Sequence, residues 1–394
     1  MQHFKALADP VKERLFHLRP EVLRRTSDPG LLAVALGATL YTPATRSALA
    51  EGIRKQARAG CLSTVICLED AVPDAEVPAA EENLLAALTE LDGMDDPGGL
   101  PLIFIRCRTP EQLLDVGRRA GAALDVVSGF VLPKFENETG RGRAFLEALR
   151  LLNEESGRTA DPYAPALRAM PIIEDLSTTH LESRVRVLTD NLALVKEFRG
   201  LVLCVRIGAT DMSSAFGLRR SRDLTIYNVK VVANIIGDVV NIFGRPDDGW
   251  VISGPVWEHF ANTERVLRPQ LRATPFEAIN EGALRQRILM DNLDGLIREI
   301  ELDQANGLLG KTVIHPSHVP VVHSMCVVSH EEYVDALAIA GDTGGGVKAS
   351  PYGNKMNESK PHRAWAERTL LRARAFGVAN PGVSFVELLE ASMR

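Results

Sequence analysis

Two acidic residues, Glu174 and Asp211, each follow a short apolar run of the chain. The runs span residues 169–173 and 201–207, and their composition predicts buried strands. If these strands are parallel, both carboxylates lie at the same rim of the sheet. Two carboxylates that leave positions open for water and substrate suit a hard divalent cation such as Mg2+. The pair therefore predicts an enzyme that uses a metal ion.

Both residues also have a simpler interpretation, which is helix capping. Glu174 would cap a helix that begins near Asp175, and Asp211 would cap the segment that runs into Met212 and Ser213. Acidic residues are common where a strand passes into a helix, because they accept hydrogen bonds from N–H groups of the first turn. The local sequence leaves both interpretations open, so the choice depends on the other strand ends.

The composition is that of an ordinary globular protein. Of the 394 residues, 45% are hydrophobic and 24% are charged, and no apolar run is long enough to cross a membrane. The formal net charge of −6 argues against nucleic-acid binding. The first ten residues have no apolar segment and the five cysteines show no C-x-x-C spacing. We therefore expect a cytoplasmic protein with reduced cysteines.

Short apolar runs recur along the chain, separated by stretches with helical periodicity. Eight runs predict strands, at residues 33–41, 64–68, 102–106, 129–132, 169–173, 201–207, 250–252 and 311–314. Helices are expected at residues 48–59, 110–120, 142–152, 181–196, 227–243 and 284–304. Strands that alternate with helices indicate a parallel sheet, and eight such units predict an α/β fold of the closed (β/α)8 TIM-barrel type. No G-x-G-x-x-G motif follows the first strand, which argues against a dinucleotide-binding fold.

In such a barrel the chemistry lies at the C-terminal strand ends. Polar residues follow every predicted strand, and they are Tyr41 and Arg46, Glu69 and Asp70, Arg106 and Arg108, Lys134 and Glu136, Glu174, Asp211, Ser253, and His315. Capping alone does not require so many acidic and basic groups at one rim, so the metal interpretation of Glu174 and Asp211 is favoured. His315, His318 and His323 offer a second metal site, but His-Pro at a strand end is interpreted more simply as a turn and a helix start.

After His318 the alternation of strands and helices stops. Residues 341–346 and 350–358 are rich in glycine and polar side chains, and they separate two expected helices at 331–339 and 361–376. A loop of that length in a compact protein is usually functional or disordered, and we expect a lid. The predicted organisation is an N-terminal extension (1–30), a barrel (31–325) and a C-terminal lid with helices (326–394).

Six segments of the chain occur in an order that is specific even though each is short. They are L-Y-T-P-A-T-R from Leu40, I-C-L-E-D-A-V from Ile66, P-K from Pro133, P-I-I-E from Pro171, G-A-T-D from Gly208 and G-K-T-V-I-H-P from Gly310. Together they resemble the HpcH/HpaI aldolase/citrate lyase family over residues 31–376. Within it, the chain is similar to the citrate lyase beta subunit and to a branch described as C-C bond lyases of the TIM-barrel fold.

The resemblance implies a Mg2+-dependent enzyme, with Mn2+ as a substitute, that cleaves or forms a carbon–carbon bond beside a carbonyl. Glu174 and Asp211 match the family's metal ligands, and Arg106 matches an arginine that binds the substrate carboxylate. Residues 353–358 resemble an element whose acidic residue, here Glu358, reaches a neighbouring subunit's active site as acid or base. The resemblance also implies a homo-oligomer, a trimer or a hexamer, in which the C-terminal segment crosses to the neighbour.

The remaining strand-end residues are assigned supporting roles in this chemistry. Glu69 and Asp70 are candidates for catalytic groups that hold metal-bound water. Tyr41, Arg46 and Lys134 join Arg106 and Glu174 as candidate substrate-binding residues, and Lys134 is interpreted as electrostatic support. Arg106 and Asp70 also have structural alternatives, which are a salt bridge at the barrel mouth and a helix cap.

Three functions follow from these residues. The first is a lyase or aldolase that acts on a small 2-oxo or 2-hydroxy carboxylate, and the second is an acyl-CoA lyase or thioesterase of the malyl-CoA or citramalyl-CoA type. Relatives tend to carry a lysine and an arginine where this chain has Val77 and Glu81, a departure that argues against a CoA thioester more than against metal chemistry. The third is a non-catalytic scaffold, which has no physical reason to keep converging carboxylates.

Overall fold

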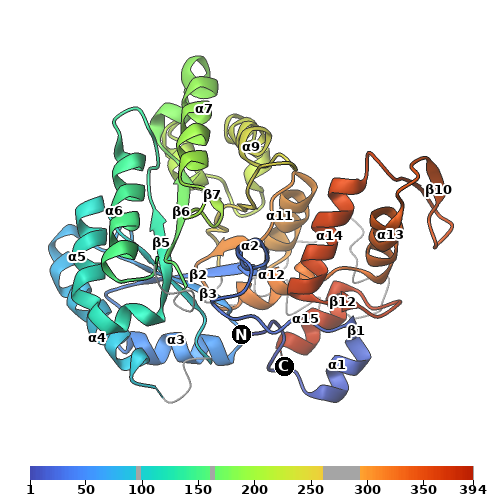
Figure 1. Cartoon of the computed structure of the whole chain (residues 1–394), viewed down its shortest axis with the longest axis horizontal. Helices are drawn as coiled ribbons and strands as arrows, with labels where there is room; N and C mark the ends of the chain where they lie inside the picture. Colours follow the sequence, from blue (N-terminus) through green and yellow to red (C-terminus); the bar gives the residue numbers. More distant parts are fainter. Residues whose placement is uncertain (95–98, 160–164, 261–292, 394) are drawn as a thin grey trace.

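The computed structural model describes residues 1–94, 99–159, 165–260 and 293–393 (Figure 1). Eight parallel strands form one sheet in the order β8-β7-β6-β5-β4-β3-β2-β9. Apart from β9, strands that are consecutive in the chain are neighbours in the sheet. The strands are β2 (Ala38–Pro43), β3 (Ser63–Cys67), β4 (Leu102–Arg106), β5 (Val127–Leu132), β6 (Arg168–Ile173), β7 (Val205–Ile207), β8 (Ile252–Ser253) and β9 (Lys311–Val313).

The two ends of this sheet, β8 and β9, are joined by backbone hydrogen bonds. The N–H of Leu309 donates to the carbonyl of Ile252 (2.9 Å), and the N–H of Gly254 donates to the carbonyl of Gly310 (3.1 Å). The N–H of Thr312 in turn donates to the carbonyl of Gly254 (3.1 Å). The sheet therefore closes on itself, and the predicted (β/α)8 barrel is confirmed.

Alternate residues of each strand face the inside and the outside of the barrel wall. Phe104 and Ile172 belong to a buried cluster that fills the interior, whereas Ile103 and Ile105 pack outward in a second cluster with the helices. Arg106 lies two residues after Phe104 on the same strand, so its side chain faces inward as well. The last inward-facing residue of each strand therefore lies at the mouth of the barrel.

Helices connect successive strands and cover the outside of the barrel (Figure 1). They are α3 (Leu49–Arg58), α4 (Val77–Asp92), α5 (Pro110–Ala120), α6 (Arg141–Glu155), α7 (Leu181–Glu197), α8 (Ala209–Ser214), α9 (Lys230–Phe243) and α11 (Asp294–Ala305), with short 3-10 turns η1 (Asp74–Glu76), η3 (Gly121–Val126), η4 (Leu176–Thr178) and η5 (Ile226–Asn228). Residues 284–292, the first part of one expected helix, lie outside the described residues.

The rest of the chain forms a C-terminal unit beside the barrel (Figure 1). The helix α12 (His318–Cys326) precedes this unit and packs against β2 and β9 of the barrel. The elements of the unit are α13 (His330–Gly341), β10 (Val347–Ala349), β11 (Met356–Glu358), α14 (Arg363–Phe376), β12 (Val378–Ala379) and α15 (Phe385–Met393). The N-terminal α1 (Asp9–Leu15) and β1 (Phe16–Leu18) lie with this unit, because β1 pairs antiparallel with β12. The proposed boundaries at residues 30 and 325 stay a prediction.

One expected strand is wrong in detail. The expected strand at 33–41 begins only at Ala38, because α2 (Pro29–Ala35) occupies the first part of the run. Asp28 caps this helix by accepting the N–H of Leu31 (2.9 Å), and Pro29 suits the first helical position.

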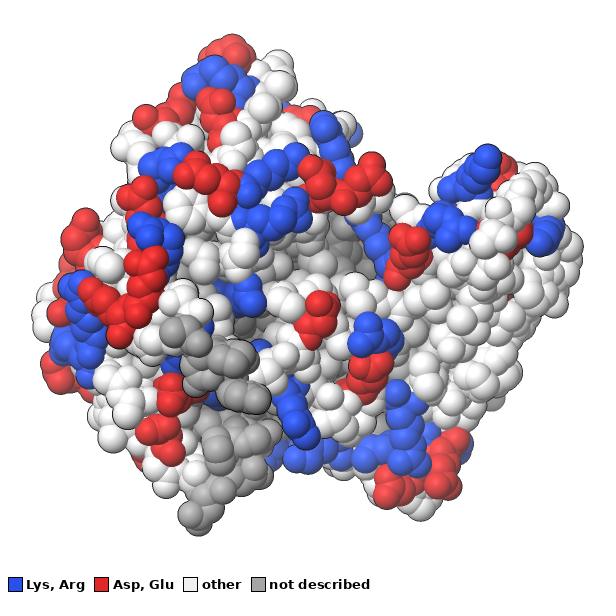
Figure 2. All heavy atoms as spheres, in the orientation of Figure 1, with Lys and Arg blue, Asp and Glu red and all other residues white. Residues whose placement is uncertain are grey.

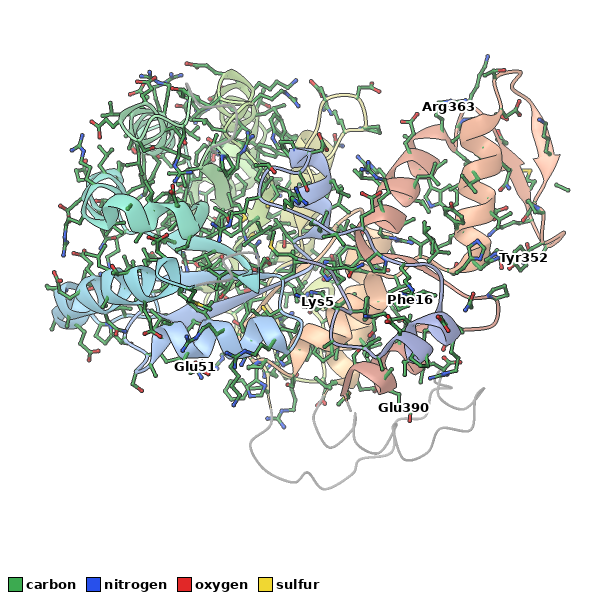
Figure 3. The ribbon with its side chains drawn as sticks, turned by 60° about the horizontal axis from the view of Figure 1, so that its bottom comes forward. Lys5, Phe16, Glu51, Tyr352, Arg363 and Glu390 are labelled. Atoms are coloured by element: carbon green, nitrogen blue, oxygen red, sulfur yellow. The ribbon has the colours of Figure 1, made fainter. Side chains whose placement is uncertain are left out.

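Residues 341–358, where a long loop was expected, contain β10 and β11, which pair antiparallel as a hairpin. The role of this segment as a lid stays a prediction. Figure 3 shows Tyr352 of this hairpin on the opposite side of the molecule from Glu51 of α3.

All five cysteines are buried and unpaired, as the sequence predicted. Within the described part of the chain, no helix combines the length and the apolar character that a membrane crossing requires.

Candidate active site

Charged side chains from four neighbouring strand ends meet at the carboxyl end of the barrel. Glu69 and Asp70 follow β3, Arg106 ends β4, Lys134 follows β5 and Glu174 follows β6. We call these five residues the charged cluster. Because β3, β4, β5 and β6 are neighbours in the sheet, charged groups at their ends lie close together in space.

Arg106 is the centre of the charged cluster. Its Nη2 lies 2.7 Å from Oε2 of Glu69, 3.2 Å from Oδ2 of Asp70 and 3.1 Å from Oε1 of Glu174. Burial lowers the pKa of the Arg106 guanidinium, but Glu174, Tyr41 and Glu69 raise this pKa by more. Arg106 is therefore a permanent cation held among three carboxylates.

Lys134 contributes both its backbone and its side chain. Its φ of 49° lies in the left-handed region, which is uncommon for a residue other than glycine. The backbone N–H of Lys134 donates to Oε1 of Glu174 (2.9 Å), and Nζ contacts Oε1 of Glu69 (2.5 Å). The strained turn after β5 thus brings an N–H group to Glu174 and an ammonium group to Glu69.

Glu174 is buried and directs its two oxygens to different sides. Oε1 accepts from Arg106 and Lys134, whereas Oε2 lies against Gly208, where a Cβ atom would come within 2.0 Å of it. Gly208 immediately precedes α8, whose first turn contains Asp211. Burial raises the pKa of Glu174 to about 7, and the charge of Asp211 adds to the increase while Arg106 opposes it.

The balance of charge at this site fits a divalent cation. The site holds four acidic groups, which are the three carboxyl groups of the charged cluster and that of Asp211. It holds two cations, Arg106 and Lys134, so the acidic groups outnumber the cations by two. In the described residues no group of three or more His, Cys, Asp or Glu side chains is arranged to hold a metal. Glu174 and Asp211 would thus supply two ligands, and water or substrate the others, which is how Mg2+ is commonly bound.

The predicted substrate-binding residues Tyr41 and Arg46 have different positions. Tyr41 lies on β2 within electrostatic range of Arg106 and Glu174, and burial raises its pKa. Arg46 is exposed in the loop before α3, where its side chain lies near Gly52. The structure brings Tyr41 to the charged cluster but does not show Arg46 there.

Glu358 ends β11 in the C-terminal hairpin. Its backbone N–H donates to Nδ1 of His362 (3.1 Å), and it pairs with Val347 across the hairpin. Within the described part of a single chain, no contact joins Glu358 to the charged cluster. Its predicted catalytic role therefore depends on delivery to a second copy.

Arg108 is a residue for which the sequence analysis predicted no role. Its Nε donates to the carbonyl of Leu68 (2.8 Å), and its Nη2 donates to the carbonyls of Glu69 (3.3 Å) and Val72 (2.5 Å). Arg108 also pairs with Asp74. The guanidinium thus fixes the loop that presents Glu69 and Asp70. The sequence signal for this role was the position of Arg108, two residues after Arg106 at the end of the same strand.

The three C-terminal histidines do not form a metal site in the described residues. Nδ1 of His315 lies 2.7 Å from Oγ of Ser317, and α12 begins at His318 as expected for a turn and helix start. His323 is buried against His3 and Phe376. These contacts support the simpler interpretation of the histidines.

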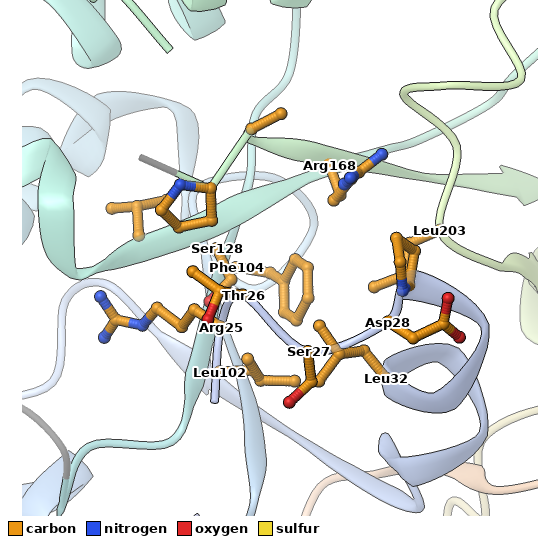
Figure 4. A pocket seen from close by; sticks show the side chains of 14 residues that line it. Arg25, Thr26, Ser27, Asp28, Leu32, Leu102, Phe104, Ser128, Arg168 and Leu203 are labelled. Carbon is orange, nitrogen blue, oxygen red and sulfur yellow. The ribbon is translucent and has the colours of Figure 1, made fainter. Parts of the chain in front are cut away.

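A cavity of about 270 Å³ lies at the opposite end of the barrel (Figure 4). Leu102, Val127 and Arg168, the first residues of β4, β5 and β6, line it. Figure 4 shows Phe104 in the middle of the view and the guanidinium of Arg25 turned away from it. This cavity is therefore distinct from the charged cluster at the carboxyl ends.

The fold and the charged cluster define a TIM-barrel protein with an acidic centre at its strand ends. A family model described as C-C bond lyase of the TIM-barrel fold matches residues 30–378. The chain belongs to this family and is a carbon–carbon lyase, as the resemblance implied.

Two of the solved structures that match the chain show the same fold. A citrate lyase from Burkholderia xenovorans LB400 is 16% identical, with a TM-score of 0.56, and the match covers 94% of this chain and 97% of that chain. CitE from Mycobacterium tuberculosis, solved with magnesium, acetoacetate and coenzyme A, is 21% identical, with a TM-score of 0.50, and the match covers 86% and 99%. At these identities the likeness shows the fold alone. Among curated protein sequences, none matches the chain significantly.

Proposed function

We propose that the protein is a Mg2+-dependent lyase or aldolase acting on a small 2-oxo or 2-hydroxy carboxylate. The observation that carries this proposal is the excess of acidic groups over cations where Glu174 packs against Gly208, close to Asp211 and beside the buried Arg106. Complexes of CitE with magnesium and acetoacetate support it. Mn2+ is expected to substitute, because both ions accept hard oxygen ligands.

Each residue of the charged cluster has a task in this proposal. Bound Mg2+ would supply Lewis acidity to the carbonyl or hydroxyl oxygen of the substrate. Arg106 offers a planar guanidinium to the substrate carboxylate. Glu69 and Asp70 orient water molecules beside the metal, and Lys134 keeps Glu69 and Glu174 in place.

Glu358 is proposed to act as an acid or base in the active site of a neighbouring subunit, in a homotrimer or a hexamer. The hairpin that carries it exposes apolar side chains, since Val347 is 62% and Met356 is 58% exposed. Figure 2 shows few charged side chains over much of the C-terminal unit on the face in view. Exposed apolar surface of this kind is typical of a contact with another subunit.

A CoA thioester is the alternative substrate, because the related CitE was solved with coenzyme A. In this chain Glu81 accepts a hydrogen bond from Gln112 (2.7 Å) and pairs with Arg119 (3.0 Å), which places an acidic group where relatives tend to be basic. Thermal protection by free CoA would favour a CoA thioester as the substrate.

A cytoplasmic site of action is also proposed, supported by the five buried, unpaired cysteines.

Metal-dependent thermal stabilisation tests the proposed function. Mg2+ should raise the Tm of the wild-type protein, because a ligand that binds the folded state alone stabilises it. Glu174→Ala or Asp211→Ala should abolish this rise. Asp190→Ala, which changes a surface carboxylate on α7, serves as the control and should retain it. Undiminished Mg2+ binding by Glu174→Ala would show that the site is assigned wrongly.

A further inference from the structure

Five arginines are buried in the described part of the chain: Arg106, Arg158, Arg184, Arg206 and Arg220. Four of them pair with a carboxylate, namely Arg106 with Glu174, Arg158 with Asp125, Arg184 with Asp238 and Arg220 with Glu299. Arg206 has no carboxylate partner among the described residues. Within the described ranges, every buried guanidinium group except that of Arg206 therefore has a carboxylate partner.

Among the described residues, the contacts of Arg206 are with neutral groups. Its Nη1 lies 3.3 Å from Oγ1 of Thr39 and 4.0 Å from Sδ of Met170, and its Nη2 lies 2.5 Å from Oγ1 of Thr312. The thiol of Cys204 is a further neighbour, because Arg206 lowers its pKa against the larger effect of burial. The Nε of Arg206 is buried and has no hydrogen-bond partner.

An isolated cation of this kind is costly. Arg206 is only 1% exposed, so its charge is removed from water without an opposite charge among the contacts that the structure describes. Burial of an unpaired charge is strongly unfavourable, and an apolar side chain of similar size would normally be preferred. A buried cation that is not compensated by the fold is expected where an anion from outside the chain supplies the missing charge.

Arg206 lies next to the proposed active site. It is on the inner face of β7, two residues before Gly208, against which Glu174 packs. Its Cζ is 5.7 Å from the centre of the Tyr41 ring, and Tyr41 is within electrostatic range of Arg106 and Glu174 as well. Tyr41 is partly exposed, whereas Arg206 is fully buried, so Arg206 lies deeper in the barrel than Tyr41.

We propose that Arg206, with the hydroxyl groups of Thr39 and Thr312, binds a second oxyanion group of the substrate, deeper in the barrel than Arg106. This inference rests on the proposed function, since it concerns the same substrate. A carboxylate or a phosphate fits, because the planar fork of a guanidinium binds either through paired hydrogen bonds. The substrate would then carry two anionic groups, one at Arg106 and one at Arg206.

The first test measures the stability of the protein without ligand. Replacing Arg206 by Met removes an uncompensated charge, so the Tm of Arg206→Met should equal or exceed that of the wild type. Arg220→Met is the matched control, and its Tm should fall because Glu299 loses a buried partner. An equally large fall for Arg206→Met would mean that the chain itself compensates Arg206, which would overturn the proposal.

The second test measures ligand selectivity by calorimetry in the presence of Mg2+. Malate and lactate share a 2-hydroxy carboxylate, but only malate has a second carboxylate. The wild type should bind malate more tightly by roughly tenfold or more, as expected for a charge-assisted contact. Arg206→Met should bind the two acids equally, with lactate affinity unchanged. Inorganic phosphate alone tests whether the second group is a phosphate. If it is, this ion should stabilise the wild type but not Arg206→Met.

The outcomes separate this inference from the proposed function. Equal binding of malate and lactate by the wild type, with no effect of phosphate, would overturn the oxyanion site and leave Mg2+-dependent binding of hydroxy acids intact. Failure of every probe to bind, with or without Mg2+, would count against both. A selectivity for malate that survives in Arg206→Met would place the second carboxylate elsewhere.

Discussion

At the residue scale, the charged cluster depends on groups that restrict one another. Oε1 of Glu174 is occupied by Arg106 and by the backbone of Lys134, which leaves Oε2 on the side of Gly208 and Asp211. Glycine is required at position 208, because a Cβ atom there would overlap the carboxylate. The position of Glu174 is thus determined by a strained turn, a guanidinium and a missing side chain together.

Arg106→Lys tests the guanidinium at this scale. A lysine ammonium keeps the charge but loses the planar fork, so we expect the exchange of pyruvate methyl protons in D2O, with Mg2+ present, to slow by about a hundredfold. Arg118→Lys, which changes a surface pair with Glu155, should leave the rate unchanged. If Arg106→Lys exchanged the protons at the wild-type rate, the planar fork would not be needed and the positive charge alone would suffice.

At the element scale, the N-terminal segment is anchored to the barrel by a pair of buried imidazoles. Nε2 of His3 lies 2.8 Å from the carbonyl of Ala35, and the His3 ring is 4.4 Å from that of His323 and 4.3 Å from that of Phe376. Burial lowers the pKa of His3 to about 4 and that of His323 well below its usual value. Both side chains are therefore neutral in the folded protein at neutral pH.

This pair predicts a loss of stability in acid. A histidine with a lowered folded-state pKa contributes stability above its unfolded pKa of 6.5, and the contribution is lost as the pH falls towards 4. For His3 alone the loss at pH 4 is about 3 kcal/mol. His3→Phe should flatten the dependence of Tm on pH, whereas His17→Phe, at an exposed position, should not. Parallel curves for wild type and His3→Phe would contradict the assignment.

The C-terminal hairpin is an element with its own internal support. Asp335 of α13 is buried, and its Oδ1 accepts from Oγ of Ser350 (2.7 Å) and from Nδ2 of Asn357 (2.7 Å). Its Oδ2 lies 2.9 Å from Nζ of Lys355. One carboxylate thus ties both strands of the hairpin to the helix, so the element that carries Glu358 is held in a defined position.

Asp335→Ala should release this hairpin. Three polar side chains would lose their shared partner, and the backbone near residues 343–355 should become a preferred site of limited proteolysis. Asp115→Ala, on the surface of α5 where its partner is Arg119, provides a control with no expected change in cleavage. Equal cleavage rates for wild type and Asp335→Ala would show that the hairpin is held by other contacts.

At the scale of the whole molecule, the charged cluster and Glu358 lie on different parts of one chain. Figure 1 places β10, the partner of β11, at the far side of the C-terminal unit, away from β5 and β6. A complete set of the proposed catalytic groups therefore requires a second copy. This is the physical reason to propose an oligomer.

Mixed oligomers test this arrangement. Glu358→Gln and Glu174→Ala should each reduce proton exchange by about a hundredfold or more when pure. Subunits of the two variants, mixed under conditions that allow exchange, should regain part of the activity, because some sites then combine an intact cluster with an intact Glu358. Absence of recovery, or sedimentation of the wild type as a monomer only, would contradict action between subunits.

Much of the barrel could be predicted from local patterns. The expected strands at 102–106 and 169–173 correspond to β4 and β6 almost residue for residue, because a buried parallel strand is a continuous apolar run with polar residues at its end. The same pattern brought Glu69, Arg106, Lys134 and Glu174 to one rim. Their convergence follows from strand order, so the sequence by itself determined the site's location.

Only the tertiary structure decided which charges are compensated. In the sequence, Arg206 is a charged residue within an apolar strand, and nothing local identifies its partners. Its contacts with Thr39 and Thr312 span 167 and 106 positions of the chain. The hairpin contacts of Asp335 and the loop contacts of Arg108 likewise join separate segments. Periodicity reports which face of an element a residue occupies, whereas the partner across the barrel depends on closure of the whole sheet.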